Sequence, residues 1–177
     1  MNVYLIGYRC TGKTTIAKMI GRSLGWEYID ADVKLVDDYG MTISDMVSRE
    51  GWAGFRKKEQ SVLKEISTLK KHVIATGGGV ILDSENCQIM KDTGIVIWLK
   101  AQPDTIMDRM MKDRMTDDQR PALTDKKLAQ EILDTLQERL PLYEGAMNFS
   151  VETDKSSVTD IEKIILSRLK EKYLLEA

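Results

Sequence analysis

The chain has 177 residues, 42% hydrophobic and 31% charged, with a formal net charge of −2 at pH 7. This composition is typical of a single globular domain and excludes a disordered or fibrous protein. A chain of this length buries roughly 70% of the surface that its unfolded state exposes. The balance of charge argues against a general nucleic-acid binder, because such a protein needs a basic surface for phosphates.

The cysteines and the apolar runs predict the cellular compartment of the protein. Cys10 and Cys87 are too few for a disulfide framework, and they favour a reducing compartment. No apolar run approaches the roughly 20 residues that span a bilayer, and the first residues lack the basic segment of a signal peptide. We therefore expect one cytoplasmic domain over residues 1–177, without a membrane or nucleic-acid partner.

Short apolar runs alternate with helical patterns along the chain. The runs predict strands over residues 2–7, 26–30, 72–76 and 94–99, with a weaker fifth strand over residues 147–152. Helical patterns cover residues 13–24, 51–66 and 126–145, and a last helix follows the fifth strand. Strands that alternate with helices form a mostly parallel sheet covered on both faces. We therefore predict an α/β sandwich that binds ligands at the carboxyl ends of its strands.

The stretch GYRCTGKT follows the first predicted strand and fits the phosphate-loop pattern G-x-x-x-x-G-K-[ST] through Gly7, Gly12, Lys13 and Thr14. Glycines let backbone N–H groups close around an anion, and the next helix directs about half a positive charge at it. Lys13 would bridge the β- and γ-phosphates, and Thr14 would bind Mg²⁺. The alternative is a plain glycine-rich turn, but the strand before and the helix after favour a nucleoside triphosphate site.

A second glycine-rich stretch, TGGGV at residues 76–80, follows the third predicted strand. Three consecutive glycines lose much conformational entropy on folding, so their presence needs a reason. The functional interpretation is that this backbone closely approaches a ligand beside the phosphate loop. The alternative is a flexible turn.

Two carboxylates, Asp30 and Asp32, stand at the end of the second predicted strand. Because they are two residues apart, they would face the same side of an extended segment. One would hold Mg²⁺ through water, and the other would accept a proton from an attacking hydroxyl. The alternative for Asp32 is to cap a helix that begins at Val33.

The helical pattern over residues 126–145 has its apolar stripe on Leu128, Ile132, Leu133, Leu136 and Leu140. At about 100° per residue, Arg139 falls within this stripe rather than opposite it. An inward arginine needs an anion to offset its desolvation, whereas the alternative is a surface arginine at a helix end. Pro141 follows closely, so we expect the helix to end or kink there.

The helical pattern over residues 51–66 has a similar feature. Its apolar stripe consists of Phe55, Val62, Leu63, Ile66 and Leu69. Glu59 falls inside the stripe and Arg56 at its border, three residues apart, so the two would pair. Either they form a self-contained ion pair, or Glu59 holds the Arg56 fork towards an anionic ligand. The sequence leaves both open.

Residues 110–124 are polar, contain a proline and lie between helical patterns, which is typical of a mobile lid. Arg120 in this segment would bring positive charge to a phosphoryl group as the lid closes and excludes water. The alternative is an ordinary solvated loop.

Together these motifs resemble the shikimate kinase family over nearly the whole chain. The matching stretches, in the family's order and at similar spacings, are GYRCTGKTT, IDADV, FRKKE, TGGGV, RPAL and ERLPLY. The resemblance implies the fold of the nucleoside monophosphate kinases, a five-stranded parallel sheet flanked by helices, with a lid. It also implies transfer of the γ-phosphoryl group of ATP to the 3-hydroxyl of shikimate, a step in making aromatic amino acids.

The resemblance also implies roles for individual residues. The ATP-binding residues would be Cys10, Thr11, Gly12, Lys13, Thr14, Thr15, Arg109 and Arg120. Shikimate would be bound within a region of about residues 32–60, and by residues after it, through Asp32, Arg56, Gly77, Gly78, Gly79 and Arg139. Thr14 and Asp30 would hold Mg²⁺, with Arg109 stacked on adenine. The catalytic residues would be Lys13, Asp32 and Arg120, with Asp32 as the base.

One residue departs from the family, and two other functions stay open. Members of the family usually carry glycine where this chain has Cys10. A thiol so close to a helix N-terminus would be oxidation-sensitive, whereas the alternative is a chance substitution. The rival functions are another small-molecule kinase, acting on gluconate or a nucleotide, and a non-catalytic ligand-binding relative. We expect a monomeric enzyme that uses ATP and Mg²⁺ for direct in-line transfer.

Overall fold

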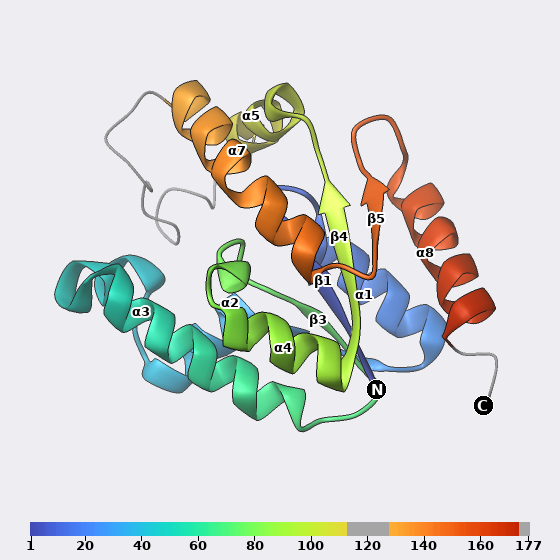
Figure 1. The fold of residues 1–177 in the computed structure, drawn as a ribbon, viewed down its shortest axis with the longest axis horizontal. Coiled ribbons are helices and arrows are strands. Elements are labelled where there is room, and N and C mark those ends of the chain that lie inside the picture. Colours follow the sequence, from blue (N-terminus) through green and yellow to red (C-terminus); the bar gives the residue numbers. More distant parts are fainter. Residues whose placement is uncertain (113–127, 174–177) are drawn as a thin grey trace.

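The computed structural model describes residues 1–112 and 128–173 of the chain. Its centre is a sheet of parallel strands, which are β1 (Asn2–Ile6), β2 (Glu27–Asp30), β3 (His72–Ala75), β4 (Gly94–Lys100) and β5 (Phe149–Glu152). Their order across the sheet is β2-β3-β1-β4-β5 (Figure 1). All five predicted strands are present, and the predicted parallel α/β sheet is confirmed.

Helices connect the strands and cover both faces of the sheet (Figure 1). They are α1 (Lys13–Leu24), α2 (Ala31–Tyr39), α3 (Ile43–Ser67), α4 (Ser84–Thr93), α5 (Pro103–Lys112), α7 (Leu128–Ala146) and α8 (Val158–Lys172), with a short 3₁₀ turn, η1 (Val80–Leu82). Helices α1 and α8 pack on one face, while α2, α3, α4 and α7 pack on the other. The three-layer sandwich is therefore confirmed. Within the described residues, no helix is long and apolar enough to cross a membrane.

The central strand β1 shows why the sheet needs two covering layers. Val3, Tyr4, Leu5 and Ile6 are all fully buried. Tyr4 and Ile6 pack with the α2, α3, α4 and α7 layer, and Val3 and Leu5 pack with the α1 and α8 layer. Alternate side chains of a strand point to opposite faces, so an unbroken apolar run requires helices on both sides.

The strand order places the candidate site. β1 lies between β3 and β4, and the chain adds strands first on one side of β1 and then on the other. At such a switch in direction the connections leave a crevice outside the carboxyl ends of the strands. The phosphate loop, the aspartates after β2 and the glycine triplet after β3 all lie at this edge.

Helix α7 differs from its prediction in two ways. It does not end at Pro141 but continues to Ala146, with the proline inside the helix. The predicted stripe is also displaced, because Leu128, Leu133 and Leu140 are exposed. The buried face consists of Glu131, Ile132, Thr135, Arg139, Tyr143 and Ala146. The face of α7 that packs against the site carries polar side chains. The spacing of apolar residues therefore could not identify it as the buried face.

Two further boundaries were also predicted wrongly. Helix α2 begins at Ala31 rather than at Val33, and Asp30, not Asp32, is its N-cap. Leu69 was placed in the apolar stripe of α3, but it lies beyond the end of that helix and is 40% exposed. The rest of that stripe is buried, as predicted.

Candidate active site

The loop between β1 and α1 has the backbone geometry of a phosphate cradle. Gly7 has φ of 143°, and a Cβ there would lie 2.5 Å from the carbonyl oxygen of Leu99. Gly12 has φ of 92° and caps α1. Nζ of Lys13 donates to the carbonyl oxygens of Gly7 and Tyr8, at 2.9 and 2.8 Å. The lysine therefore lies over the loop, where the N-terminus of α1 also directs its partial positive charge.

Thr14 and Asp30, both predicted to hold Mg²⁺, lie together beside the loop. Oγ1 of Thr14 donates to Oδ2 of Asp30 at 2.5 Å. A hydroxyl next to a carboxylate fits Mg²⁺, which takes hard oxygen ligands and completes its shell with phosphates and water. Among the described residues no group of three or more acidic, histidine or cysteine side chains forms a cage around a metal. This donor set therefore suits a cation that arrives with a nucleotide.

Asp30 and Asp32 are brought together by the start of α2 rather than by an extended strand. Oδ1 of Asp30 accepts from the backbone N–H groups of Asp32 and Val33, at 3.1 and 3.4 Å. The capping role considered for Asp32 therefore belongs to Asp30. Both aspartates nevertheless line the cavity next to the phosphate loop, together with Lys13 and Thr14.

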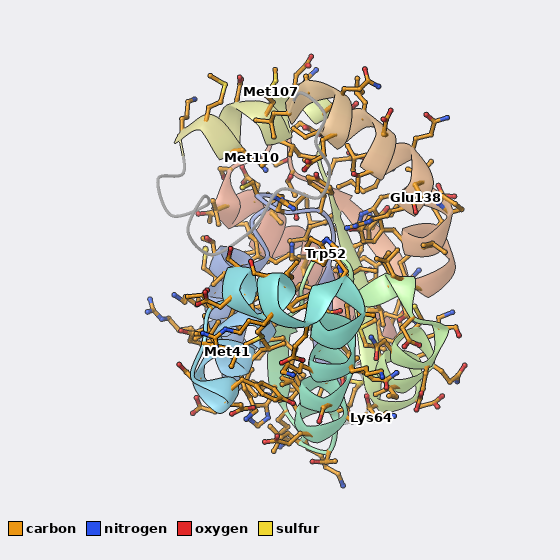
Figure 2. All side chains as sticks on the ribbon, turned by 90° about the vertical axis from the view of Figure 1, so that its left-hand side faces the viewer. Met41, Trp52, Lys64, Met107, Met110 and Glu138 are labelled. Carbon is orange, nitrogen blue, oxygen red and sulfur yellow. The ribbon has the colours of Figure 1, made fainter. Side chains whose placement is uncertain are left out.

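A second cavity, which we call the arginine pocket, opens beside the first. It is lined by Tyr8, Arg9, Lys13, Asp32, Ile43, Trp52, Phe55, Arg56, Glu59, Gly77, Gly78, Gly79 and Arg139. Trp52 directly follows the kink of α3 at Gly51, and Figure 2 shows it on the side of α3 that is turned towards α5 and α7. Lys13 and Asp32 line both cavities, so the two spaces meet at these side chains.

Arg56 and Glu59 form the predicted ion pair inside the arginine pocket. Nη1 of Arg56 donates to Oε2 of Glu59 at 2.6 Å, and Glu59 is only 5% exposed. Burial raises the pKa of Glu59, and the guanidinium of Arg56 partly opposes this shift. The guanidinium also lies over the rings of Trp52 and Phe55, 5.5 and 4.9 Å from their centroids. These contacts hold Arg56 in the wall of the pocket.

The glycine triplet has a packing reason that the sequence did not show. A Cβ at Gly79 would overlap the guanidinium of Arg56. A Cβ at Gly77 would lie 2.5 Å from Oε1 of Glu59 and 2.9 Å from Oδ1 of Asp32. Glycines are therefore needed so that these charged side chains of α2 and α3 can lie against the loop after β3.

Arg139 is 8% exposed and points into the same pocket from α7. Its Nη1 donates to the carbonyl oxygen of Gly78 at 3.2 Å, and the hydroxyl of Tyr143 donates to the same oxygen at 2.6 Å. Tyr143 in turn stacks on Trp98 of β4, with ring centroids 5.3 Å apart. The inward orientation predicted for Arg139 is confirmed, and a carbonyl of the triplet anchors it.

Arg109, on α5, lies beside the phosphate loop on the other side. Its Nη1 donates to the carbonyl oxygen of Cys10 at 3.2 Å, and its Nη2 donates to that of Thr153 at 2.6 Å. With Cys10, Thr11, Gly12 and Thr15 it lines a further cavity, whose wall also includes Ser156 and the first turn of α8. This position, next to the loop and bounded by apolar side chains, suits a nucleotide base.

Some site residues were missed, and one lies outside the described residues. Tyr8, Arg9, Trp52 and Thr153 line the cavities but were not predicted. Tyr8 and Arg9 fall at variable positions of the phosphate-loop pattern, so the pattern gives no signal for them. Arg120 and most of the predicted lid fall within residues 113–127, outside the described part of the chain.

Comparisons with known proteins agree with this geometry. The sequence model of the family "Shikimate kinase" matches residues 9–170. A shikimate kinase of Syntrophus aciditrophicus is 34% identical, over 94% of this chain and 90% of its own length. The structure of the shikimate kinase of Acinetobacter baumannii in complex with shikimate is 33% identical, with a TM-score of 0.90 over 98% of this chain and 94% of that one.

A more distant structural neighbour shows that a shared fold does not establish a shared function. A gluconokinase from Sinorhizobium meliloti has a TM-score of 0.61 but is only 14% identical, over 98% of this chain and 95% of that one, so it shares the fold alone. By contrast, the family model matches most of the chain, and the shikimate kinase of Syntrophus aciditrophicus is 34% identical over most of both chains. These two matches show family membership and not only a shared fold. This chain belongs to the shikimate kinase family.

Proposed function

We propose that this protein transfers the γ-phosphoryl group of ATP to the 3-hydroxyl of shikimate, giving shikimate 3-phosphate and ADP in aromatic amino acid biosynthesis. The observation that carries the proposal is the junction of the two cavities. Lys13 and Asp32 line both the cavity of the phosphate loop and the arginine pocket. A phosphate donor in one cavity and an acid acceptor in the other would therefore meet at these two side chains, as in-line transfer requires.

ATP would bind along the phosphate loop, with its phosphates on Thr11, Gly12, Lys13, Thr14 and Thr15. Lys13 would exchange its contacts with loop carbonyls for phosphate oxygens, which carry more negative charge. Arg109 would cover the base, held in place by the carbonyls of Cys10 and Thr153.

Thr14 and Asp30 would hold Mg²⁺ beside the phosphates. Their oxygens already lie 2.5 Å apart, so both would reach a single small cation, directly or through water. Bound there, Mg²⁺ would neutralise negative charge that develops on the β- and γ-phosphates. Asp30 keeps its position because it also caps α2.

Shikimate would lie in the arginine pocket with its carboxylate between Arg56 and Arg139. The ion pair with Glu59 and the carbonyl of Gly78 fix these two guanidinium groups. The backbone of Gly77, Gly78 and Gly79 would contact the substrate from the side of β3. Such paired, preoriented arginines select a carboxylate through bidentate hydrogen bonds.

Asp32 would hold the acceptor hydroxyl and take its proton, since it faces both cavities. Lys13 supplies positive charge from the loop. Residues 110–112 of the predicted lid belong to α5, where Met110 is buried, so the predicted start of the lid is wrong. We place Arg120, on a lid within residues 113–124, as the second cation on the transferred phosphoryl group. Transfer is direct, without a covalent enzyme intermediate.

We also propose that the whole chain is a single domain, with its shikimate-binding region at about residues 32–60, and acts as a monomer in the cytoplasm. Two cysteines are too few for a disulfide framework, in keeping with a reducing compartment. The identity to shikimate kinases over most of the chain favours shikimate over gluconate or a nucleotide as the acceptor, because the gluconokinase shares the fold alone. A non-catalytic role is disfavoured because Lys13 and Asp32 are both present at the junction.

A coupled ADP-release assay tests the function. Shikimate, gluconate and nucleoside monophosphates are each offered with ATP, with and without magnesium. We expect turnover with shikimate only, lost when magnesium is chelated and restored when it is added back. Turnover of gluconate or a nucleotide with none of shikimate would contradict the assignment.

A further inference from the structure

The hydroxyl of Tyr8 is buried in the wall of the arginine pocket. Tyr8 directly follows Gly7 in the phosphate loop, is 2% exposed and lines the pocket. Its backbone carbonyl accepts from Thr11 and Lys13. Among the described residues no group makes a hydrogen bond of acceptable geometry to its hydroxyl. A buried hydroxyl rarely stays unpaired without a reason, so this group is available to a ligand that enters the pocket.

A second buried donor without a partner belongs to Arg139, which lines the same pocket. Nε of Arg139 has no hydrogen-bond acceptor among the described residues, although Nη1 of the same side chain donates to Gly78. Arg139 is close enough to Tyr8 to lower the pKa of its phenol, but burial has the larger effect and raises it. Tyr8 is therefore a neutral donor at physiological pH, beside a cationic one.

The ring of Tyr8 is fixed in place, and with it the hydroxyl. It packs against Ile106 and Met110 of α5 and Ile132 of α7. Arg9 lies over the ring, 5.7 Å from its centroid. A clamped aromatic ring offers its hydroxyl at little further cost in side-chain entropy, which favours its use as a binding group.

The charges around the hydroxyl favour an anion. Arg9 and Arg139 both act on Tyr8, against one buried carboxylate, that of Glu131. Thr135, on the same face of α7, is also near enough to lower the pKa of Tyr8, although the two hydroxyls do not meet with hydrogen-bond geometry. Two cations and two unpaired donors together call for an acceptor with negative charge.

We propose that the hydroxyl of Tyr8 donates a hydrogen bond to the carboxylate of the acid substrate, next to Nε of Arg139. This inference rests on the proposed function, because it adds a third carboxylate donor to the pair of arginines. It makes the variable second position of the phosphate loop a determinant of acceptor specificity. The loop that holds the donor's phosphates would then also recognise the acceptor.

Calorimetric titration of shikimate into wild type and Tyr8→Phe tests the proposal, with steady-state kinetics alongside. The variant keeps the ring and loses only the hydroxyl. We expect its Kd and KM for shikimate to rise roughly tenfold, with kcat and the KM for ATP within about twofold. Tyr4→Phe is the matched control: Tyr4 is also fully buried, but its hydroxyl pairs with Thr93 away from the pocket. Its shikimate affinity should equal that of wild type.

An analogue of shikimate in which hydrogen replaces the carboxylate separates a carboxylate contact from a structural role. The analogue offers no carboxylate oxygen to the hydroxyl of Tyr8, so wild type and Tyr8→Phe should bind it with equal, weaker affinity. An equal loss for the acid and the analogue would assign Tyr8 to the scaffold and overturn the proposal, as would an unchanged affinity for the acid. Tyr8→Leu provides a second variant without the hydroxyl, and thermal unfolding reports whether each variant folds.

The same titrations distinguish this inference from the proposed function. Binding of shikimate to wild type, with no loss in Tyr8→Phe, contradicts the role of Tyr8 alone. Binding without phosphorylation by wild type contradicts the proposed function, while the Tyr8→Phe comparison still tests the contact. Absence of shikimate binding to wild type contradicts both.

Discussion

Cys10 holds a backbone conformation that suits glycine better than any other residue. Its φ is 60°, and it is one of two non-glycine residues with positive φ in the described part of the chain, the other being Lys71. A side chain in this left-handed region costs roughly 1–2 kcal/mol, because Cβ crowds the next carbonyl oxygen. The phosphate loop of this protein therefore carries strain that relatives with glycine at this position avoid.

We expect Cys10→Gly to stabilise the protein against unfolding. Relief of the strain exceeds the entropy that glycine gains in the unfolded chain, for a net gain of about 0.5–1 kcal/mol. Thermal unfolding should show a rise in Tm of about 2–4 °C per kcal/mol for a chain of this size. The gain is modest because Cys10 also packs beside Tyr8 and Ile106.

Lys71→Gly is the matched control for this substitution. Lys71 has φ of 59° but is exposed and lies just before β3, away from the site. Both variants should stabilise. A rise in Tm for Lys71→Gly with a fall for Cys10→Gly would mean that contacts of the thiol outweigh the strain, contrary to our expectation.

At the scale of elements, the loop after β3 and helix α3 are fitted to each other. The absent side chains of Gly77 and Gly79 leave the space that Glu59 and Arg56 occupy. The guanidinium of Arg56 is the far end of a flexible side chain, so an added methyl group at Gly79 would displace it rather than break the backbone. The loop thus sets the position of a binding residue that belongs to another element.

We expect Gly79→Ala to damage shikimate binding much more than stability. The displaced Arg56 loses its place over Trp52 and beside Glu59, so the KM for shikimate should rise tenfold or more. The KM for ATP should stay within about twofold, since Gly79 does not line the phosphate cavity. Steady-state kinetics and thermal unfolding measure the two effects.

Gly145→Ala is the matched control within α7. A Cβ at Gly145 meets no atom within 4 Å, so the substitution should leave kinetics unchanged and raise stability by about 0.5–1 kcal/mol. If Gly79→Ala bound shikimate as tightly as this control, Arg56 would not be the binding group that we propose.

The same elements show what the sequence could predict. The central strands β1, β3 and β4 were predictable because a strand buried on both faces reads as a nearly continuous apolar run. The phosphate loop was predictable because its function depends on backbone geometry that only a local run of glycines provides. The edge of a parallel sheet predicted that the aspartates after β2 lie near the phosphate loop, and the contact between Thr14 and Asp30 agrees with this, whereas their assignment to one Mg²⁺ came from the family resemblance.

What could not be predicted depends on contacts between distant segments. The reason for the glycine triplet lies in Glu59 and Arg56, on another element. The buried face of α7 carries Glu131, Thr135 and Arg139, so apolar periodicity displaced the predicted stripe towards leucines that are exposed. Trp52 and Tyr8 became site residues only when α3, α5 and α7 were placed around the loop.

At the scale of the whole molecule, two binding sites share one pair of side chains. The strand order opens a crevice at the end of β1, and α2, α3 and α7 supply the acid-binding side of it. Lys13, which follows the phosphate loop, and Asp32, on α2, both lie at the junction of the two cavities. Neither cavity alone would bring a phosphoryl group to a hydroxyl. Catalysis therefore depends on the junction at which the two cavities meet.

We expect Asp32→Asn to separate catalysis from binding. The amide keeps the size of the carboxylate, but it accepts no proton from the acceptor hydroxyl, so kcat should fall about 10²- to 10⁴-fold. Removal of one negative charge from the wall of the phosphate cavity does not weaken the attraction for ATP. Shikimate would lose one charged hydrogen bond and keep the two arginines, so its Kd should rise by roughly tenfold.

Thermal unfolding with each ligand measures binding independently of turnover. A ligand at about 100 times its Kd stabilises by about 2.7 kcal/mol, which corresponds to a rise in Tm of roughly 5–10 °C here. With each ligand adjusted to its own Kd, Asp32→Asn should show the wild-type rise with MgATP and with shikimate, yet release almost no ADP. A variant with near wild-type kcat would remove Asp32 as the base. Loss of both thermal shifts would instead show that Asp32 maintains the junction, because the two cavities would have failed together.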